Sequence, residues 1–253
     1  MKIDFYHWSY QCPINAEMID LLREYEGSFE LRLHDITGRP ELAKEMRMFY
    51  PTLTVVDGRY RFYSPLDRAF LDALCGGTIP AEEPYRPSLG TRELVGEIVP
   101  LTRENCAIAG RCTGRTGAGC ESCAARKARF LEECRLEIFG FLNLHEGGLA
   151  GGAEYLPSLL VPYDIPRGER TAFITCVYLS DPEFDGKSAP LRALERYLAG
   201  TYDRALVVSE EEGVFPNGDV AFFLRNGYRD LGVVASEDYC TLHLMEKRLT
   251  AER

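Results

Sequence analysis

The chain has 253 residues, of which 45% are apolar and 27% charged, and it carries a formal net charge of −10 with a pI near 5.0. This length predicts two domains, each large enough to bury a core. The acidic balance repels nucleic acid and anionic lipid at long range, which favours a small-molecule or protein partner. No apolar run has the length of a signal peptide or a membrane span, so we expect a cytoplasmic protein without a membrane or nucleic-acid partner.

Residues 2–74 alternate between strand and helix patterns. The stretches "KIDFYHW" (2–8) and "FELRLHDI" (29–36) are typical of strands, and apolar residues recur at helical spacing between them. A polar helix is expected in "RPELAKEMRMF", then a hairpin turning at Asp57-Gly58 and a helix with a capped start at Ser64-Pro65. The predicted order is β-α-β-α-β-β-α.

Two local features give this order a resemblance to the thioredoxin fold. "QCPIN" puts Cys12 where the first strand meets the first helix, and "YPTLTVVDG" puts Pro51 just before a strand. The resemblance implies that Cys12 matches the attacking cysteine and Tyr50-Pro51 the cis-proline bond. Asn15 stands where the resolving cysteine would be, so a redox role would be monothiol or would borrow another cysteine.

Cys12 has a physical interpretation that is independent of the family. A thiol at a helix N-terminus faces the positive end of the helix dipole, which favours the thiolate and predicts a nucleophile. The alternative is that Cys12 caps a helix in a thioredoxin-like module that only binds or packs.

A segment rich in glycine, proline and charge, residues 77–93, is interpreted as a linker between a first domain at 1–76 and a second at 94–253. In the second domain, strands are expected in "GEIVPLT", "LEIFGFLNL" and "GLAGGAEYLP", and "TAFITCVYLS" (171–180) is apolar enough for a buried central strand. A helix with Leu191, Leu194 and Leu198 on one face follows a glycine turn, and later strands close the sheet. The fold class is α/β (α+β), with a mixed sheet.

The turn "EFDGKSA" (183–189) precedes that helix, and backbone amides at a helix N-terminus bind anions such as a pyrophosphate. The order of elements, the late "NGY" (226–228) and the phrases "AEYLP" and "FITCVYLS" resemble the GNAT acyltransferase superfamily, specifically YoaP-type GNAT proteins. The resemblance implies an acetyl-CoA site with the pantetheine arm along the central strand and the pyrophosphate at the turn. The residues implied are Cys176, Val177, Tyr178, Leu179, Ser180, Gly186, Lys187, Ser188 and Ala189.

The chain departs from the superfamily pattern at several positions. Glu183 replaces a basic or amide residue, Asp185 adds negative charge, and Ser188 replaces a glycine. Phe223 stands where superfamily members often carry a tyrosine that protonates the departing thiolate, so another acid is needed. The candidates near the ends of elements are Tyr178, Ser209 and Tyr228.

Four cysteines, Cys106, Cys112, Cys120 and Cys123, lie within eighteen residues between a predicted strand and a predicted helix. A reducing compartment disfavours permanent disulfides. The Cys120–Cys123 gap has the length of a metal knuckle, and four thiolates suit a structural zinc ion better than an iron–sulfur cluster. A reactive pair at Cys120 and Cys123, and thiols that only line a loop beside the acyl cleft, are the alternatives.

Taken together, these patterns predict an N-acyltransferase that moves an acetyl group from acetyl-CoA to an amine of a small molecule or protein. The second hypothesis is a thiol- or metal-responsive protein that uses Cys12 and the 106–123 segment on a degenerate acyltransferase scaffold. The third is a binding protein without turnover.

Overall fold

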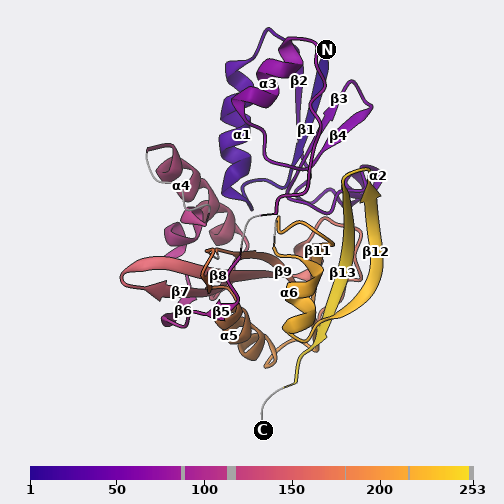
Figure 1. Ribbon diagram of the computed structural model, residues 1–253. Helices are drawn as coiled ribbons and strands as arrows, with labels where there is room; N and C mark the ends of the chain where they lie inside the picture. Colours follow the sequence, from indigo (N-terminus) through magenta and orange to yellow (C-terminus); the bar gives the residue numbers. More distant parts are fainter. Residues whose placement is uncertain (87–88, 113–117, 180, 216, 251–253) are drawn as a thin grey trace.

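The computed structural model describes residues 1–86, 89–112, 118–179, 181–215 and 217–250, and for residues 118–121 it describes the backbone. The chain forms two units that pack against each other, the first at the top of Figure 1 and the second below it. Within the described residues, no helix is both long and apolar enough to cross a bilayer.

The first unit is a four-stranded sheet with the order β2-β1-β3-β4. Strand β1 is parallel to β2 and antiparallel to β3, and β3 and β4 form the hairpin predicted at Asp57-Gly58. The predicted β-α-β-α-β-β-α order is confirmed, whereas membership of the thioredoxin fold stays a prediction. The elements are β1 (Lys2–His7), α1 (Pro13–Glu24), β2 (Glu30–Asp35), α2 (Pro40–Glu45), β3 (Thr52–Val56), β4 (Tyr60–Phe62) and α3 (Arg68–Cys75).

The start of α3 differs from the prediction. The helix begins at Arg68, and its cap is Asp67, whose carboxylate accepts a hydrogen bond from the backbone N–H of Phe70 at 2.8 Å. Ser64 does not cap the helix because residues 65–67, which follow it, are not helical. A cap residue needs only a free side-chain acceptor near the first turn, and Asp67 supplies one three residues later.

The second unit is a seven-stranded mixed sheet with the order β12-β13-β11-β9-β8-β7-β6, and a separate pair is formed by β5 and β10. Helix α4 packs on the η1 turn, and α5 packs on β7 and β8. The elements are β5 (Arg92–Glu93), β6 (Glu97–Leu101), η1 (Cys106–Arg111), α4 (Ala118–Glu133), β7 (Gly140–His145), β8 (Gly148–Pro157), η2 (Ser158–Leu160), β9 (Thr171–Tyr178), β10 (Phe184–Asp185), α5 (Ser188–Leu198), β11 (Arg204–Glu210), α6 (Val220–Arg225), β12 (Arg229–Glu237) and β13 (Cys240–Arg248).

The middle of this sheet is open. Strands β9 and β11 run parallel, but they pair only over Thr171–Phe173 and Arg204–Leu206. Beyond that point β9 continues to pair with β8 up to Tyr178, and β11 with β13 up to Glu210. The two central strands therefore stop bonding to each other while each stays bonded to its outer neighbour, which leaves backbone groups of β9 facing an opening.

The first unit lies over this end of the sheet (Figure 1). Trp8 packs edge-on against Tyr163 and Phe130 of the second unit, with ring centroids 5.2 and 6.0 Å away. Tyr50 donates its hydroxyl to Glu210 at 3.1 Å, and Arg61 pairs with Glu237 at 2.8 Å. One apolar cluster includes buried residues of both units, so the two share a core.

Candidate functional site

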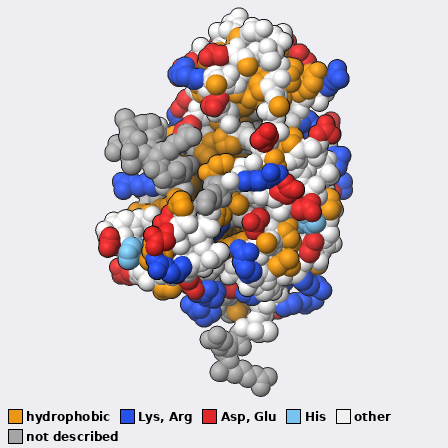
Figure 2. All heavy atoms as spheres, in the orientation of Figure 1, with side chains coloured by type: hydrophobic (Ala, Val, Ile, Leu, Met, Phe, Trp, Pro, Cys, Tyr) orange, Lys and Arg blue, Asp and Glu red, His pale blue; other side chains and the backbone are white. Residues whose placement is uncertain are grey.

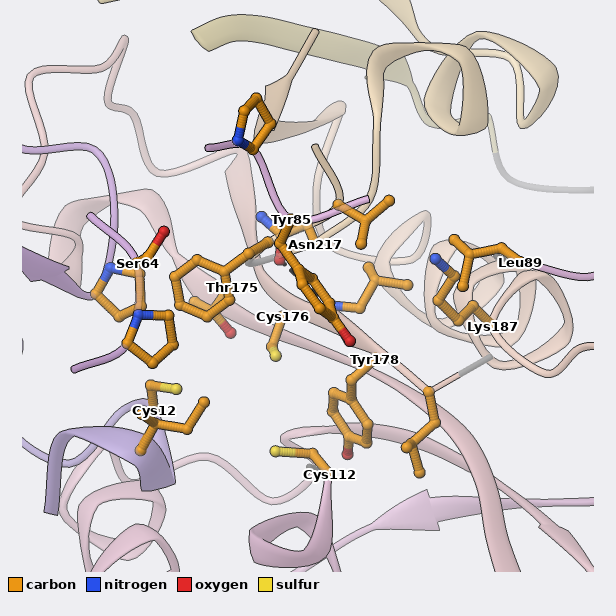
Figure 3. A pocket seen from close by; sticks show the side chains of 18 of the residues that line it. Cys12, Ser64, Tyr85, Leu89, Cys112, Thr175, Cys176, Tyr178, Lys187 and Asn217 are labelled. Carbon is orange, nitrogen blue, oxygen red and sulfur yellow. Dashed lines mark hydrogen bonds between the residues drawn. The ribbon is translucent and has the colours of Figure 1, made fainter. Parts of the chain in front are cut away.

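A cavity of about 760 Å³ lies where the two units meet. Its walls include the β1–α1 connection with Gln11 and Cys12, the interunit segment around Tyr85, β9 with the turn that follows it, the end of η1 with Cys112, and Asn217. Figure 3 shows side chains from these parts directed into one space. The cavity thus lies at the opening between β9 and β11, and residues of the first unit form one of its walls.

Two backbone groups on the edge of β9 that faces this opening bind side-chain amides. The carbonyl of Thr175 accepts a hydrogen bond from Nε2 of Gln11 at 3.3 Å, and the N–H of Val177 donates to Oδ1 of Asn217 at 3.2 Å. Asn217 also donates from Nδ2 to the carbonyl of Val208 at 2.9 Å, so its amide bridges the two separated strands. Gln11 and Asn217 are 3% and 2% exposed, which means that these amide contacts are shielded from water.

The predicted pyrophosphate turn is held by a side chain of its own. Oδ1 of Asp185 accepts hydrogen bonds from the backbone N–H of Lys187 at 2.8 Å and of Ser188 at 3.1 Å. Oδ2 of Asp185 accepts a third from the Ser188 hydroxyl at 2.6 Å. Two of the amides expected to bind an anion are therefore already bound to a carboxylate.

Gly186 lies so close to β8 that no larger residue fits. A Cβ built there would stand 2.1 Å from the carbonyl oxygen of Ala150, and one at Gly151 would stand 2.1 Å from the carbonyl oxygen of Gly186. This contact places the turn against the sheet. Gly186 thus has a packing role in addition to its predicted place in the turn.

We expect Gly186→Ala to lower the free energy of unfolding by about 1–3 kcal/mol, because the added methyl group must push two backbones apart. Urea titration followed by circular dichroism measures this change. Gly200→Ala is the matched control, because a Cβ there meets nothing closer than 3.6 Å. Equal stability of the two variants would contradict the tight contact.

Lys187 points into the cavity from the start of α5 (Figure 3). Its Nζ lies 4.5 Å from the ring centroid of Phe222, and within the described ranges no carboxylate pairs with it. Burial lowers the pKa of this ammonium. It is a buried cation with spare donor capacity, which is what an anionic group entering the cavity needs.

Three thiols, those of Cys12, Cys112 and Cys176, line the same cavity and come from three different elements (Figure 3). Burial raises the pKa of Cys12 to about 11 and that of Cys112 to about 12, and it raises the pKa of Cys176 well above its ordinary value. The expectation that the helix N-terminus makes Cys12 a thiolate is wrong, since desolvation outweighs the favourable charges nearby. All three are held as neutral thiols.

Asn15, at the position of a resolving cysteine, is fully buried. Its Nδ2 donates to the carbonyls of Ser9 at 2.9 Å and of Pro51 at 3.0 Å. The residue ties the Cys12 loop to the Pro51 loop, and both loops contribute to the cavity wall.

A buried ion pair lies beside the thiols, and sequence reasoning missed it. Nζ of Lys127 on α4 stands 2.9 Å from Oε1 of Glu154 on β8, with the two side chains 0% and 1% exposed. Neither of these two atoms has another hydrogen-bond partner of good geometry in the described structure, so each depends on the other. The sequence contained one sign of this pair, namely Glu154 inside the otherwise apolar and small-residue run of β8. A charged side chain is almost never fully buried unless it is paired, so this glutamate predicts a buried cation nearby.

Tyr178 lines the cavity and lies next to this ion pair. Its ring packs on Gly152, where a Cβ would stand 2.5 Å from the tyrosine oxygen, and its ring centroid is 5.6 Å from Nζ of Lys127. Burial first, and then the charge of Glu154, raise its pKa well above the ordinary value. Its hydroxyl makes no hydrogen bond of good geometry among the described residues, although the Glu154 carboxylate is near enough to accept from it, so it is a neutral donor that a ligand would share with Glu154.

The other predicted catalytic residues lie elsewhere. Ser209 is fully buried and donates to the carbonyl of Gly218 at 2.7 Å, and Tyr228 is buried against Phe223 in a separate apolar cluster. Neither lines the cavity, so their placement gives no support to a catalytic role.

The predicted coenzyme-binding residues divide into three groups. Cys176, Val177, Tyr178, Leu179 and Lys187 line the cavity. Gly186, Ser188 and Ala189 lie in the turn and the first turn of α5, whereas Ser180 lies outside the described residues.

The predicted zinc site has no support. Among the described residues no group of three or more histidine, cysteine, aspartate or glutamate side chains could hold a metal ion. Cys106 donates to the carbonyl of Arg103 at 3.2 Å, Cys123 is buried, and Cys112 lines the cavity. The side chain of Cys120 lies outside the described part of the chain.

No protein-family model matches the chain, and no curated protein sequence is significantly similar to it. Its structural neighbours include acetyltransferases of the GNAT family. It is similar to the aminoglycoside 6'-N-acetyltransferase from Enterococcus faecium (12% identity, TM-score 0.42, 62% of this chain and 99% of that one). Similar too are an N-acetyltransferase from Staphylococcus aureus (13%, 0.41, 61% and 98%) and a GNAT-family acetyltransferase from Bacillus cereus (11%, 0.40, 62% and 98%). The likeness is distant and carries no information on the activity or substrate of this chain.

Proposed function

We propose that this protein is an N-acyltransferase that moves an acetyl group from acetyl-CoA to an amine. The observation that carries the proposal is the opening between β9 and β11, where the free edge of β9 already binds two side-chain amides. The pantetheine arm of coenzyme A is itself built from amides. The side-chain amides of Gln11 and Asn217 therefore occupy the backbone groups that we assign to the amides of the pantetheine arm. The arm would bind after these two side chains move away.

For the anionic part of the coenzyme, the cavity offers the ammonium of Lys187, which forms no ion pair among the described residues. The amides of Lys187 and Ser188 become available only if Asp185 releases them, so we assign the first phosphate contact to the Lys187 side chain. Within the cavity, Tyr178 is placed to donate its hydroxyl proton in a hydrogen bond to the reacting group. Acetyl-CoA supplies an acyl group activated as a thioester.

The first test is calorimetric titration of acetyl-CoA into the wild type, Lys187→Ala and Lys44→Ala. A hydrogen bond to a charged group contributes about 1.5–3 kcal/mol, so loss of the Lys187 ammonium is expected to weaken binding about ten- to hundredfold. Lys44 is an exposed lysine outside the cavity and serves as the matched control.

The same titration is made with the double variant Gln11→Ala/Asn217→Ala, in which the edge of β9 is free. Acetyl-CoA that binds neither the wild type nor this variant would rule out the proposed activity. Binding that is equally strong in Lys187→Ala and Lys44→Ala would remove Lys187 from the site while leaving the proposal for β9 intact.

The described residues do not favour the alternative of a thiol- or metal-responsive protein. The three thiols of the cavity are held protonated by burial, and the described residues contain no metal-binding group. Neither feature is suited to a sensor that depends on thiolates.

A further inference from the structure

The interunit segment crosses the opening between β9 and β11. The carbonyl of Tyr85 accepts a hydrogen bond from the N–H of Val214, in the loop that follows β11, at 2.9 Å. Further along the segment, the N–H of Gly90 donates to the carbonyl of Asp181, just after β9, at 2.6 Å. The segment therefore joins the ends of the two strands at the place where the strands no longer pair with each other. We call its described residues between these contacts and Glu82, residues 83–86 and 89, the strap.

The strap separates the cavity from solvent. All of its residues line the cavity, and Figure 3 shows Tyr85 on the side of Asn217 and Leu89 on the side of Lys187. Glu83, Tyr85 and Arg86 are also exposed, so no other part of the described chain covers them. Figure 2 shows hydrophobic side chains in a hollow at the boundary between the two units, with charged side chains around it. The strap is thus a wall of the cavity that is one layer of chain thick.

Both ends of the strap are firmly held. Before it, the carboxylate of Glu82 accepts a hydrogen bond from the N–H of Ser64 in the first unit. After it, β5 pairs with β10, and the N–H of Leu94 donates to the carbonyl of Asp185 at 2.9 Å. Asn143, which is fully buried, fixes the same end because its Nδ2 donates to the carbonyl of Leu94 at 2.7 Å. Buried hydrogen bonds of this kind keep the two ends in place.

The middle of the strap is held by weaker contacts. Besides the bond to Val214, it is held by an ion pair between Arg86 and Glu212, whose side chains are both more than half exposed. An exposed ion pair contributes little because water screens it. The strap also has no helix or strand of its own. Segments with few buried bonds open most readily, and the lids of binding sites are drawn from them.

We propose that the strap is a lid, which opens when its middle leaves Val214 and Glu212 while its ends stay fixed, and which closes over acetyl-CoA bound along β9. The identity of this ligand rests on the proposed acyltransferase function, whereas the opening itself is tested without a ligand. The open strap admits the coenzyme to the edge of β9. The closed strap removes water from the cavity, which strengthens the hydrogen bonds made there.

The test uses two cavity thiols as reporters of opening. Cys12 and Cys176 line the cavity, but each is only 7% exposed. Peptide mass spectrometry measures the rate at which methyl methanethiosulfonate labels them in the wild type, Glu212→Ala and Asp203→Ala. Glu212 forms the exposed pair of the strap without lining this cavity, and Asp203 forms a comparable exposed pair with Arg170. The two variants therefore remove matched ion pairs, one at the strap and one away from it.

We expect labelling of Cys12 and Cys176 to be about two- to fivefold faster in Glu212→Ala than in the wild type, because loss of an exposed ion pair raises the open fraction of the strap by that factor. Asp203→Ala should be labelled as the wild type is. Cys106, which is buried away from the cavity, should react at one rate in all three proteins. Equal labelling of the cavity thiols in the two variants, or an equal acceleration at Cys106, would overturn the lid.

The kinetics of acetyl-CoA binding separate this inference from the function on which it rests. Surface plasmon resonance on the immobilised protein should show association and dissociation rate constants that are both about two- to fivefold higher in Glu212→Ala, with a nearly unchanged Kd. Unchanged rate constants with normal binding would contradict the lid alone. Acetyl-CoA that binds none of the three proteins, although the cavity thiols of Glu212→Ala are labelled faster, would contradict the acyltransferase and leave the strap as a lid of the cavity.

Discussion

Replacing Lys127 with methionine is expected to lower the free energy of unfolding by about 3–5 kcal/mol, because it leaves a buried charge without its partner. Lys127 and Glu154 are essentially inaccessible to water, and Nζ of Lys127 is the cation that lies 2.9 Å from the Glu154 carboxylate. Burial is the largest single effect and lowers the pKa of Lys127, but the charge of Glu154 and the other groups around the ammonium together raise it, so Lys127 stays a cation. Methionine keeps most of the volume and removes the charge.

Chemical denaturation of Lys127→Met, Glu154→Gln and the double variant measures this coupling. The double variant should recover a large part of the lost stability, since neither charge remains and the volumes are nearly conserved. Arg129→Met, on an exposed face of the same helix, is the control, and we expect a change below about 0.5 kcal/mol there. Additive effects of Lys127 and Glu154 would show that the two residues do not form the pair described.

Asn217→Ala is expected to lower the free energy of unfolding by about 2–4 kcal/mol in the absence of ligand, because the N–H of Val177 and the carbonyl of Val208 each lose a buried partner. If the edge of β9 takes the coenzyme, acetyl-CoA replaces the lost amide. The increase in Tm that acetyl-CoA produces should therefore be larger for Asn217→Ala than for the wild type.

Thermal shift with and without acetyl-CoA measures this difference. Asn105→Ala is the matched control, because Asn105 also bridges two backbone groups, the N–H of Thr102 at 2.8 Å and the carbonyl of Pro100 at 2.9 Å, but lies away from the cavity. This control should lose stability without any extra gain from acetyl-CoA. The same ligand-induced shift in Asn217→Ala and the wild type would place the coenzyme somewhere other than at Val177.

Gln11 gives the two units a shared part in the proposed site. It reaches from the β1–α1 connection to the carbonyl of Thr175 in the central strand of the second unit. Acetyl-CoA bound along β9 would displace it, so coenzyme binding and the contact between the units would compete.

Local patterns were sufficient for most elements. The alternation in "KIDFYHW", the Asp57-Gly58 turn and the apolar run of β9 depend on neighbours within a few residues, and all three are confirmed. The start of α3 was misplaced because two possible cap residues, Ser64 and Asp67, lie close together in sequence, and the Asp67 carboxylate is the one that accepts from the first turn.

For the candidate site, the sequence by itself predicted three places, the central strand, the turn before α5 and the first strand-to-helix connection with Cys12, and residues of all three line one cavity. It also singled out Asp185 as an unusual negative charge. Only the tertiary structure decided what these residues do. The carboxylate of Asp185 accepts hydrogen bonds from the backbone amides of the turn, whereas the sequence suggested only that its charge would repel an anionic ligand. Gln11 donates to the carbonyl of Thr175, 164 positions away in the chain. Burial also turned Cys12 from an expected thiolate into a thiol. Hydrogen bonds between distant residues and the loss of water at a buried atom depend on how the whole chain packs, and neither is encoded in local spacing.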